Sequence, residues 1–232
     1  MGPMYLSAVL KREGYEVDVI ILNRHSVEER DNLIKEIDPD YVGCYMQSDR
    51  WDDFSSVLID IKKKFPNIKI IMGGPHPTFF KDCLDKNKDW LDVICIGEGE
   101  GAIVDLFREP DRFDIPNLWF AVGNVVFKND KRKLEDPLDN VPMMDRELYY
   151  GRYKFLKEMP VKRFITSRGC PYNCSFCYNV NWKLEYGGQA NFVRKRSPRD
   201  VLNEIKYVKE HKEELEKKEK TERSIWKKKE KK

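Results

Sequence analysis

The chain has 232 residues, of which 41% are hydrophobic and 36% are charged, and its formal net charge is +3. This length accommodates one or two domains with an ordinary hydrophobic core. The small net charge excludes the global positive field that attracts nucleic acid, and no apolar run reaches the ~20 residues that span a membrane. No secretory signal is visible, so we expect the six cysteines to lie in a reducing cytoplasm and to serve metals rather than disulfides.

Helix-like and strand-like segments alternate through the first half of the chain, and together they predict an α/β domain at residues 1–115. Short apolar strands that alternate with helices favour a parallel sheet covered on both faces, in a Rossmann-like or flavodoxin-like arrangement. In such a sheet, ligands bind beyond the carboxyl ends of the strands. In chain order the predicted elements are helix 4–13, strand 16–22, helix 27–37, strand 41–46, helix 52–65, strand 68–72, helix 78–85, strand 93–96 and helix 100–108.

Two glycine-rich loops follow predicted strands of this domain. The first reads GGPHPT over residues 73–78, and the second reads GEGE over residues 97–100, where it opens a helix. Glycine allows positive φ angles and a close approach of the backbone to a ligand, and the amides at a helix N-terminus can bind polar groups. Each loop by itself is equally consistent with a plain strand-to-helix turn.

A hairpin and a linker are expected over residues 116–160. The hairpin strands at 118–122 and 125–128 are rich in β-branched and aromatic residues, and Gly123-Asn124 supplies the turn between them. Prolines punctuate the remainder of this segment, which predicts an irregular connection to the second half of the chain.

The segment 161–209 is expected to begin a second domain. It opens with a predicted strand at 161–166 and closes with a helix, for which Ser197 is the expected N-cap and Pro198 the first helical residue. The expected apolar face of this helix carries Val201, Ile205 and Val208.

Three cysteines lie close together in this second segment. Cys170, Cys174 and Cys177 form a CxxxCxxC triplet, and three thiolates can hold three corners of a [4Fe–4S] cluster. The fourth iron is then open to another ligand, whereas an electron-carrying cluster uses four cysteines. The spacing differs from the two CxxC pairs of a zinc site, although zinc, a disulfide or unrelated thiols remain the alternatives. The scattered Cys44 and Cys95 lie in apolar runs and are expected in the core.

The run RGCPYNCSFCY over residues 168–178 resembles the motif of the radical S-adenosylmethionine (SAM) enzymes. The resemblance implies that Cys170, Cys174 and Cys177 ligate the [4Fe–4S] cluster, that SAM binds the open iron, and that one electron cleaves SAM to methionine and a 5'-deoxyadenosyl radical. It further implies that Phe176 shields the cluster and that Tyr178 lies near the adenine. The strand at 161–166 would be the first strand of a partial TIM barrel, and a flavodoxin or ferredoxin would supply the electron.

The first half of the chain, with its GGPHPT and IGEGE loops, resembles the cobalamin-binding domain that precedes the barrel in one subfamily of these enzymes. The DxHxxG motif, whose His ligates cobalt from below in other cobalamin proteins, is absent here. His25 is expected to be an exposed loop residue, and His76 is expected to contact the edge of the ligand. The cobalamin-site residues that the resemblance implies are Ser48, Gly73, Gly74, His76, Thr78, Gly97, Glu98 and Gly99.

The expected function is that of a radical SAM enzyme with an N-terminal cobalamin-binding domain. Hydrogen abstraction would lead to methyl transfer or to carbon-skeleton modification of a small molecule that the sequence does not identify. A non-catalytic cobalamin-binding module and a small iron–sulfur protein with a vestigial barrel are the alternatives.

By the resemblance, the chain looks truncated at both ends. The first strand of the sheet and most of the barrel are missing, so we expect no turnover by this chain alone. Residues 210–232 are rich in Lys and Glu, which predicts a solvated helix or a disordered end, with a basic arm for nucleic acid as the alternative.

Overall fold

The computed structural model describes residues 1–188 and 192–210, and they form two compact units. The first unit contains residues 1–134 and 141–160, and the second contains residues 135–140 and the described residues from 161 onward. In the part of the chain that the structure describes, no helix has both the length and the apolar character needed to cross a membrane.

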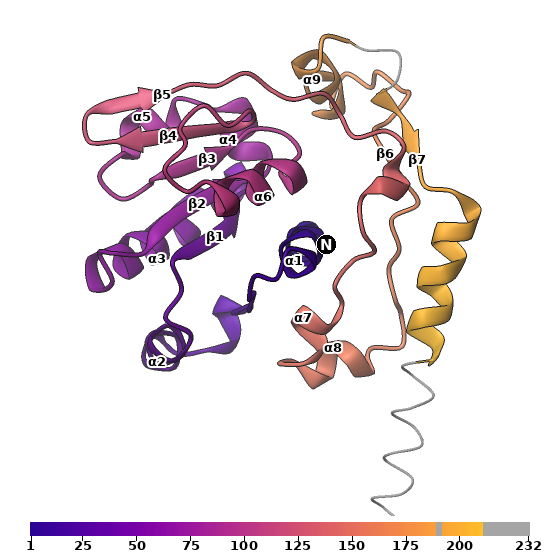
Figure 1. The fold of residues 1–232 in the computed structure, drawn as a ribbon, viewed down its shortest axis with the longest axis horizontal. Helices are drawn as coiled ribbons and strands as arrows, with labels where there is room; N and C mark the ends of the chain where they lie inside the picture. The colour runs from indigo at the N-terminus through magenta and orange to yellow at the C-terminus, as the bar shows by residue number, and fades with distance from the viewer. Residues whose placement is uncertain (189–191, 211–232) are drawn as a thin grey trace, which may run out of the picture. The chain divides into compact units, whose positions relative to one another are not determined.

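A five-stranded sheet with the order β1-β2-β3-β4-β5 is the centre of the first unit (Figure 1). The strands β1 (Tyr41–Tyr45), β2 (Lys69–Gly73) and β3 (Val93–Cys95) are parallel, as the alternation of helices and strands predicts. The predicted hairpin is also present, as β4 (Leu118–Val122) and β5 (Val125–Phe127). It does not stand apart as a linker, because β4 pairs antiparallel with β3, and the sheet is therefore mixed rather than wholly parallel.

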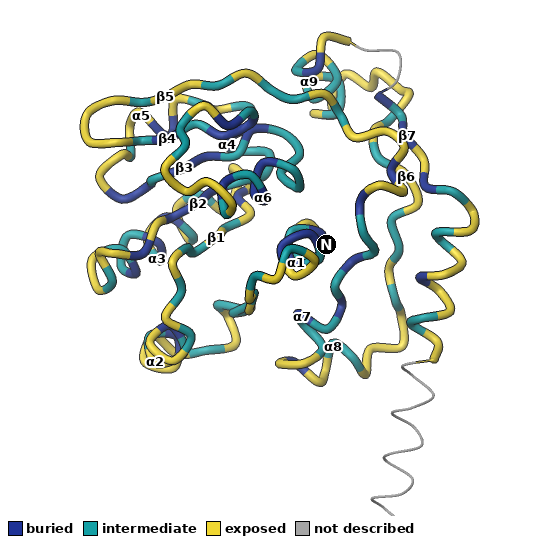
Figure 2. The backbone as a smooth tube through the Cα atoms, viewed as in Figure 1, coloured by how far each residue is buried: buried dark blue, intermediate teal, exposed yellow. Residues whose placement is uncertain are grey.

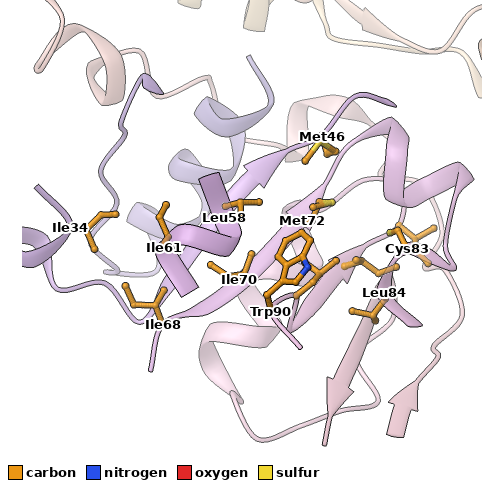
Figure 3. Close-up of a cluster of buried hydrophobic side chains, with 13 residues drawn as sticks. Ile34, Met46, Leu58, Ile61, Ile68, Ile70, Met72, Cys83, Leu84 and Trp90 are labelled. Atoms are coloured by element: carbon orange, nitrogen blue, oxygen red, sulfur yellow. The ribbon is translucent and has the colours of Figure 1, made fainter. Parts of the chain in front are cut away.

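Helices cover both faces of this sheet. On one face, α1 (Gly2–Arg12) and α6 (Glu100–Arg108) pack over Ile71 and Val93. On the other face, α2 (Val27–Ile37), α3 (Trp51–Lys64) and α5 (Cys83–Asn87) contribute to a cluster around Ile70, Met72 and Ile94 (Figure 3). Successive residues of a strand point to opposite faces, so one continuous apolar run in β2 supplies both cores. Figure 2 shows the burial concentrated in the central strands.

The local start signals of the helices explain why several boundaries agree with the sequence. Ser26 caps α2: its Oγ accepts from the Glu29 amide at 3.2 Å, and the Glu29 carboxylate accepts from the Ser26 amide at 2.8 Å. This reciprocal pair satisfies two amides that the helix leaves unpaired. The predicted bounds of α2 and α6 agree with the structure residue for residue.

Two predictions in the first unit are wrong. Residues 16–22 form no strand; residues 15–21 have no regular secondary structure, and Leu22–Arg24 is a 3-10 turn. In the described sheet, β1 is the edge strand and residues 16–22 do not pair with it, and without a paired neighbour a segment forms no strand ladder. The single helix expected at 78–85 is replaced by α4 (Pro75–Phe79) and α5, since proline is favoured in the first turn of a helix and α4 starts there.

The connection from 141 to 160 contains two short helices, α7 (Glu147–Tyr150) and α8 (Lys154–Glu158). Asp145, just before α7, is fixed to α1 because its carboxylate accepts from Ser7 Oγ at 2.6 Å and pairs with Lys11 at 2.8 Å. His25 also meets this connection, and it is therefore half-buried rather than exposed: its Nε2 lies 2.9 Å from the Tyr153 hydroxyl.

In the second unit, the strand predicted at 161–166 does not form, and these residues have no regular secondary structure. Strand pairing begins directly after this segment, where β6 (Ser167–Arg168) lies antiparallel to β7 (Arg194–Lys195). The described residues of this unit also include the 3-10 turn Leu138–Asn140 and helix α9 (Asn179–Glu185). The start of a barrel is thus not shown by the structure.

The last described helix runs over residues 198–210. Ser197 is its N-cap, as predicted, because its Oγ accepts from the Asp200 amide at 3.1 Å. The predicted apolar face is partly wrong: Ile205 is 41% exposed, and Glu204 is the fully buried position. The predicted tail at 210–232 lies outside the described residues apart from its first member.

Candidate functional site

The carboxyl ends of β1, β2 and β3 lie at the same edge of the sheet, and the three loops that follow them are bonded to one another. The Met46 amide, just after β1, donates to the Gly73 carbonyl at 2.7 Å. The His76 amide, in the loop after β2, donates back to the Met46 carbonyl at 3.1 Å. The first two loops therefore continue the parallel ladder beyond the strands.

Thr78 joins the second loop to the third. Its hydroxyl donates to the Gly74 carbonyl at 2.8 Å and accepts from the Gly97 amide at 3.1 Å. The side chain is fully buried. Thr78 is thus placed to hold the two glycine-rich loops in a fixed relation, rather than to present its own surface to a ligand.

His76 is the centre of an aromatic stack on the second loop. Its ring lies 4.4 Å from the Trp51 ring and 5.2 Å from the Phe80 ring, measured between centroids. Its Nδ1 lies 3.0 Å from the Ser48 hydroxyl, which ties the second loop to the 3-10 turn that follows β1. Burial lowers the pKa of His76 below its ordinary value, against the opposing charge of Asp82, so the neutral imidazole is favoured.

The backbone conformation requires glycine at some positions of these loops but not at Gly73. Gly74 has φ of +101°, and a Cβ there would lie 2.9 Å from the Met46 carbonyl oxygen, so the fold itself requires glycine. Gly97 has φ of +83° and is also required by backbone conformation. Gly73 is different: its φ is not positive, and a Cβ would meet only Cys95 Cβ at an ordinary 3.7 Å. The packing of the protein leaves room at Gly73 that a side chain would fill.

Asn117 holds the third loop from the other side, and sequence reasoning did not identify it. Its side-chain Nδ2 donates to the Glu98 carbonyl at 2.5 Å, and its Oδ1 accepts from the Arg132 amide at 2.7 Å. It is 1% exposed and has φ of +75°, a conformation that asparagine tolerates better than most residues. A polar residue between the apolar Ile115 and the start of β4 was the available signal.

The structure brings the candidate cobalamin-site residues together at one edge of the first unit. Ser48 is exposed, Thr78 is buried, and the others are half-buried. Glycine-rich loops at the end of a sheet suit a ligand held by shape and by backbone amide contacts. This set comprises Ser48, Gly73, Gly74, His76, Thr78, Gly97, Glu98 and Gly99.

Among the cysteines, Cys83 is buried and Cys174 is exposed, and the other four are of intermediate exposure. Cys44, Cys83 and Cys95 have pKa values raised to about 11, about 12 and about 12, because burial disfavours their thiolates. Such thiols are poor ligands and poor nucleophiles. Cys174 is exposed, and Cys170 and Cys177 are partly exposed.

The triplet Cys170, Cys174 and Cys177 lies on one loop after β6, and all three are free thiols. The Cys177 amide donates to the Cys174 carbonyl at 3.0 Å, which closes a turn between the last two cysteines. In the described parts of the chain, no three His, Cys, Asp or Glu side chains gather round a single ion position. A cluster carries several irons that take separate thiolates, so the donor set of three accessible cysteines still fits a cluster with one open iron.

Aromatic side chains around this triplet are open to solvent. Phe176 is 92% exposed and Tyr172 is 71% exposed, while Tyr178 is 55% exposed. Apolar rings that are left this exposed beside three thiols provide surface for a ligand to cover. The described structure therefore holds the candidate SAM residues Phe176 and Tyr178 beside the cysteines, without packing them into the unit.

Comparison with known proteins finds a family model that matches most of the first unit and relatives that match most of the chain. Residues 1–107 match the family model of the B12 binding domain. Over 224 residues the chain is 29% identical to the anaerobic magnesium-protoporphyrin IX monomethyl ester cyclase of Rubrivivax gelatinosus, covering 89% of this chain and 38% of the relative. Over 198 residues it is 27% identical to the cobalamin-dependent radical SAM methyltransferase TokK of Streptomyces tokunonensis, covering 80% of this chain and 27% of the relative.

The fold is also that of a solved protein. The structure of the cobalamin-dependent S-adenosylmethionine radical enzyme OxsB with aqua-cobalamin and S-adenosylmethionine bound matches with a TM-score of 0.69 at 19% identity, over 91% of this chain and 29% of that chain. The Rossmann-like fold expected for the first half is thereby confirmed. The chain spans between 27% and 38% of the length of the two curated relatives.

Proposed function

We propose that the chain is part of a radical SAM protein with a B12-binding domain, that its first unit binds cobalamin and that its second unit carries the cluster loop of a cobalamin-dependent radical SAM enzyme. In domain terms, we propose cobalamin binding for residues 1–115 and the beginning of a radical SAM domain for residues 161–209. The substrate is a small molecule, and the reaction is methyl transfer or carbon-skeleton modification.

The observation that carries this proposal is the bonded set of loops at the carboxyl edge of β1, β2 and β3. Thr78 bonds both glycine-rich loops, and the Ser48–His76 contact adds the loop after β1. Ligands of open α/β sheets bind beyond this edge. A loop set that is fixed before the ligand arrives loses less conformational freedom on binding. Gly73, where a Cβ would make only an ordinary contact with Cys95, lies on this same edge.

For the second unit, the support is the accessibility of the three thiols, together with the named chemistry of the relatives. Cys170, Cys174 and Cys177 would hold the cluster, Phe176 would cover it, and Tyr178 would contact SAM. A cluster with an open iron supplies the electron that splits SAM, and cobalamin supplies a methyl carrier. The residues of the chain bind and orient these groups and keep water away from them. A flavodoxin or ferredoxin is the proposed reductant.

The experiment is anaerobic reconstitution with iron and sulfide, followed by electron paramagnetic resonance (EPR) of the dithionite-reduced protein with and without SAM. We expect a [4Fe–4S] signal whose shape changes when SAM is added, since SAM binds the open iron. Replacing all three triplet cysteines by alanine should abolish the signal. A signal that SAM leaves unchanged would favour an iron–sulfur protein without radical chemistry, and an unchanged iron content in the triple variant would refute the assignment of the ligands.

A further inference from the structure

We propose that Gly169 and Arg196 are positioning residues that fix the place of Cys170 before any cluster binds. The inference rests on the proposed function of the cysteine loop and extends it to two residues that are not ligands. Gly169 directly precedes Cys170, Arg196 bonds the carbonyls of Ile165 and Thr166 in the segment that leads to it, and neither residue belongs to the CxxxCxxC spacing.

Gly169 is held against the backbone of Phe192. Its φ is +86°, and a Cβ built on it would lie 2.1 Å from the Phe192 carbonyl oxygen and 2.8 Å from the Phe192 carbonyl carbon. Backbone atoms cannot rotate away as the end of a flexible side chain can. Phe192 is itself buried, with 3% of its surface exposed. Any residue other than glycine must therefore move the chain at 169, and Cys170 moves with it because it is the next residue.

Arg196 fixes the same stretch from a second side. Its backbone amide donates to the Thr166 carbonyl at 2.9 Å, and its Nη1 donates to the Ile165 carbonyl at 2.8 Å. Between Thr166 and Gly169 the chain pairs as β6 with β7. The segment that leads into Cys170 is thus bonded to the segment 194–196 over its whole length.

The guanidinium of Arg196 is in turn held by the helix 198–210. It pairs with Asp200 at 2.5 Å and with the fully buried Glu204 at 2.5 Å, while its own side chain is only 4% exposed. A buried ion pair of this kind contributes little net stability compared with apolar side chains of similar volume, because desolvation offsets the attraction. The planar Arg196 guanidinium, with its forked set of donors, instead fixes the helix 198–210 relative to the Ile165 carbonyl and so to the segment that leads into Cys170.

Different contacts therefore set the positions of the three cysteines along the loop. Cys174 and Cys177 are related to each other by their own turn, in which the Cys177 amide donates to the Cys174 carbonyl. Three residues separate Cys170 from Cys174, where that turn starts, so the distance of Cys170 from the pair depends on where the chain leaves β6. Gly169 and Arg196 determine that point of departure.

The first test compares Gly169→Ala with Gly14→Ala. Both glycines have nearly the same φ, +86° and +89°, but a Cβ at Gly14 meets nothing within 4 Å. Both variants carry the same backbone strain, and only Gly169→Ala also collides with Phe192. After anaerobic reconstitution with iron and sulfide, we expect Gly169→Ala to lose most of its iron and its EPR signal, and Gly14→Ala to keep both.

The second test separates positioning from a merely structural role. The double variant Arg196→Met/Glu204→Met replaces the buried Arg196–Glu204 pair by apolar side chains and leaves the partly exposed Asp200 to solvent, so we expect the chain to stay folded with a modest change of thermal unfolding midpoint. It removes the donor to Ile165, so we expect a reduced iron content and an altered EPR spectrum in a folded chain. Arg30→Met/Asp60→Met is the control, since Arg30 is a 5% exposed, ion-paired arginine of the first unit.

Wild-type iron content and spectrum in both Gly169→Ala and the Arg196→Met/Glu204→Met variant would overturn the positioning role while leaving the proposed cluster intact. A wild-type chain that takes up no cluster under the same conditions would overturn the proposed function itself, and the positioning role with it.

Discussion

The Thr78 hydroxyl accepts a hydrogen bond from the Gly97 amide at 3.1 Å and donates one to the Gly74 carbonyl at 2.8 Å. These two bonds join loops that are 19 residues apart in sequence. The side chain is fully buried, so water cannot replace either bond when the hydroxyl is removed. A single oxygen atom therefore bonds both glycine-rich loops.

Thr78→Val keeps the shape of the side chain and removes this oxygen. We expect the free energy of unfolding to fall by about 1–3 kcal/mol, because the Gly97 amide loses its partner. We also expect cobalamin to bind more weakly, since the loops are no longer fixed before binding. Urea unfolding and a visible-absorbance titration with hydroxocobalamin measure the two effects.

Ser56→Ala is the matched control for this change. Ser56 is exposed, and its hydroxyl donates to the Asp53 carbonyl within one helix at 2.8 Å. Its loss should change stability by no more than about 0.5 kcal/mol. An equal loss in the free energy of unfolding for the two substitutions would show that the bond between the loops stabilises the fold no more than an exposed bond does.

Gly74→Ala tests the close approach of the first two loops. At Gly74 a Cβ would meet the Met46 carbonyl oxygen at 2.9 Å, whereas at Gly123 it would meet nothing within 4 Å, and both residues have positive φ. Gly123, with φ of +57°, carries the ~1–2 kcal/mol penalty of the left-handed region, whereas Gly74, with φ of +101° and ψ of −168°, lies in a region open almost only to glycine. We expect Gly74→Ala to be less stable than Gly123→Ala by a further ~1–3 kcal/mol, from backbone strain and overpacking together. Denaturant midpoints that fall equally would contradict the assigned contact.

The lowered pKa of His76 predicts a dependence of stability on pH. Its folded pKa lies below the ordinary value of 6.5, because burial opposes the imidazolium. Below pH 6.5 the unfolded chain takes up a proton more readily than the folded chain, so this contribution is complete above that pH and is lost as the pH falls through the range below it. His76→Phe retains the aromatic stack with Trp51 and Phe80 and removes the titration.

Urea unfolding at several pH values from about 7.5 to about 5, a range that includes the ordinary histidine pKa, would check this. We expect the stability of the wild type to fall more steeply toward acid than that of His76→Phe. Parallel curves for the two proteins would place the pH dependence elsewhere in the molecule.

The raised thiol pKa values of Cys44, Cys83 and Cys95, together with the exposure of Cys174, predict an order of alkylation. Burial raises the pKa of Cys44 to about 11 and that of Cys95 to about 12, so few thiolates exist there at neutral pH. Cys174 is exposed. Iodoacetamide under native, anaerobic conditions, followed by peptide mass spectrometry, should label the triplet cysteines first and Cys44, Cys83 and Cys95 only after urea is added. Early labelling of Cys95 would show that the strand end at β3 opens in solution.

Much of the first unit follows from local features of the sequence. The Ser26–Glu29 capping box fixes the start of α2, and Gly123-Asn124 fixes the turn between β4 and β5. The segments 16–22 and 161–166 have the composition of strands but do not form them, because a strand needs a partner and pairing is a non-local property. The antiparallel pairing of β4 with β3 was missed for the same reason.

In the candidate site, too, the local features could be predicted from the sequence and the long-range contacts could not. The glycine-rich loops could be placed at strand ends from the sequence, because strand–loop–helix order is local. The Thr78–Gly97 bond and the support of Glu98 by Asn117 could not, since each joins residues 19 apart that only the fold brings together. The burial of Glu204 was equally hidden, because its explanation is the position of Arg196.

The account depends most on a corrinoid binding at the carboxyl edge of β1, β2 and β3, and Gly73→Val tests this most directly. Gly73 has no positive φ and ordinary space for a Cβ, so the substitution adds volume without backbone strain. In a visible-absorbance titration with hydroxocobalamin, we expect the wild type and His25→Ala to bind one equivalent and Gly73→Val, still folded by circular dichroism, to bind little or none. Absence of binding by the wild type, or wild-type affinity in a folded Gly73→Val, would contradict the account.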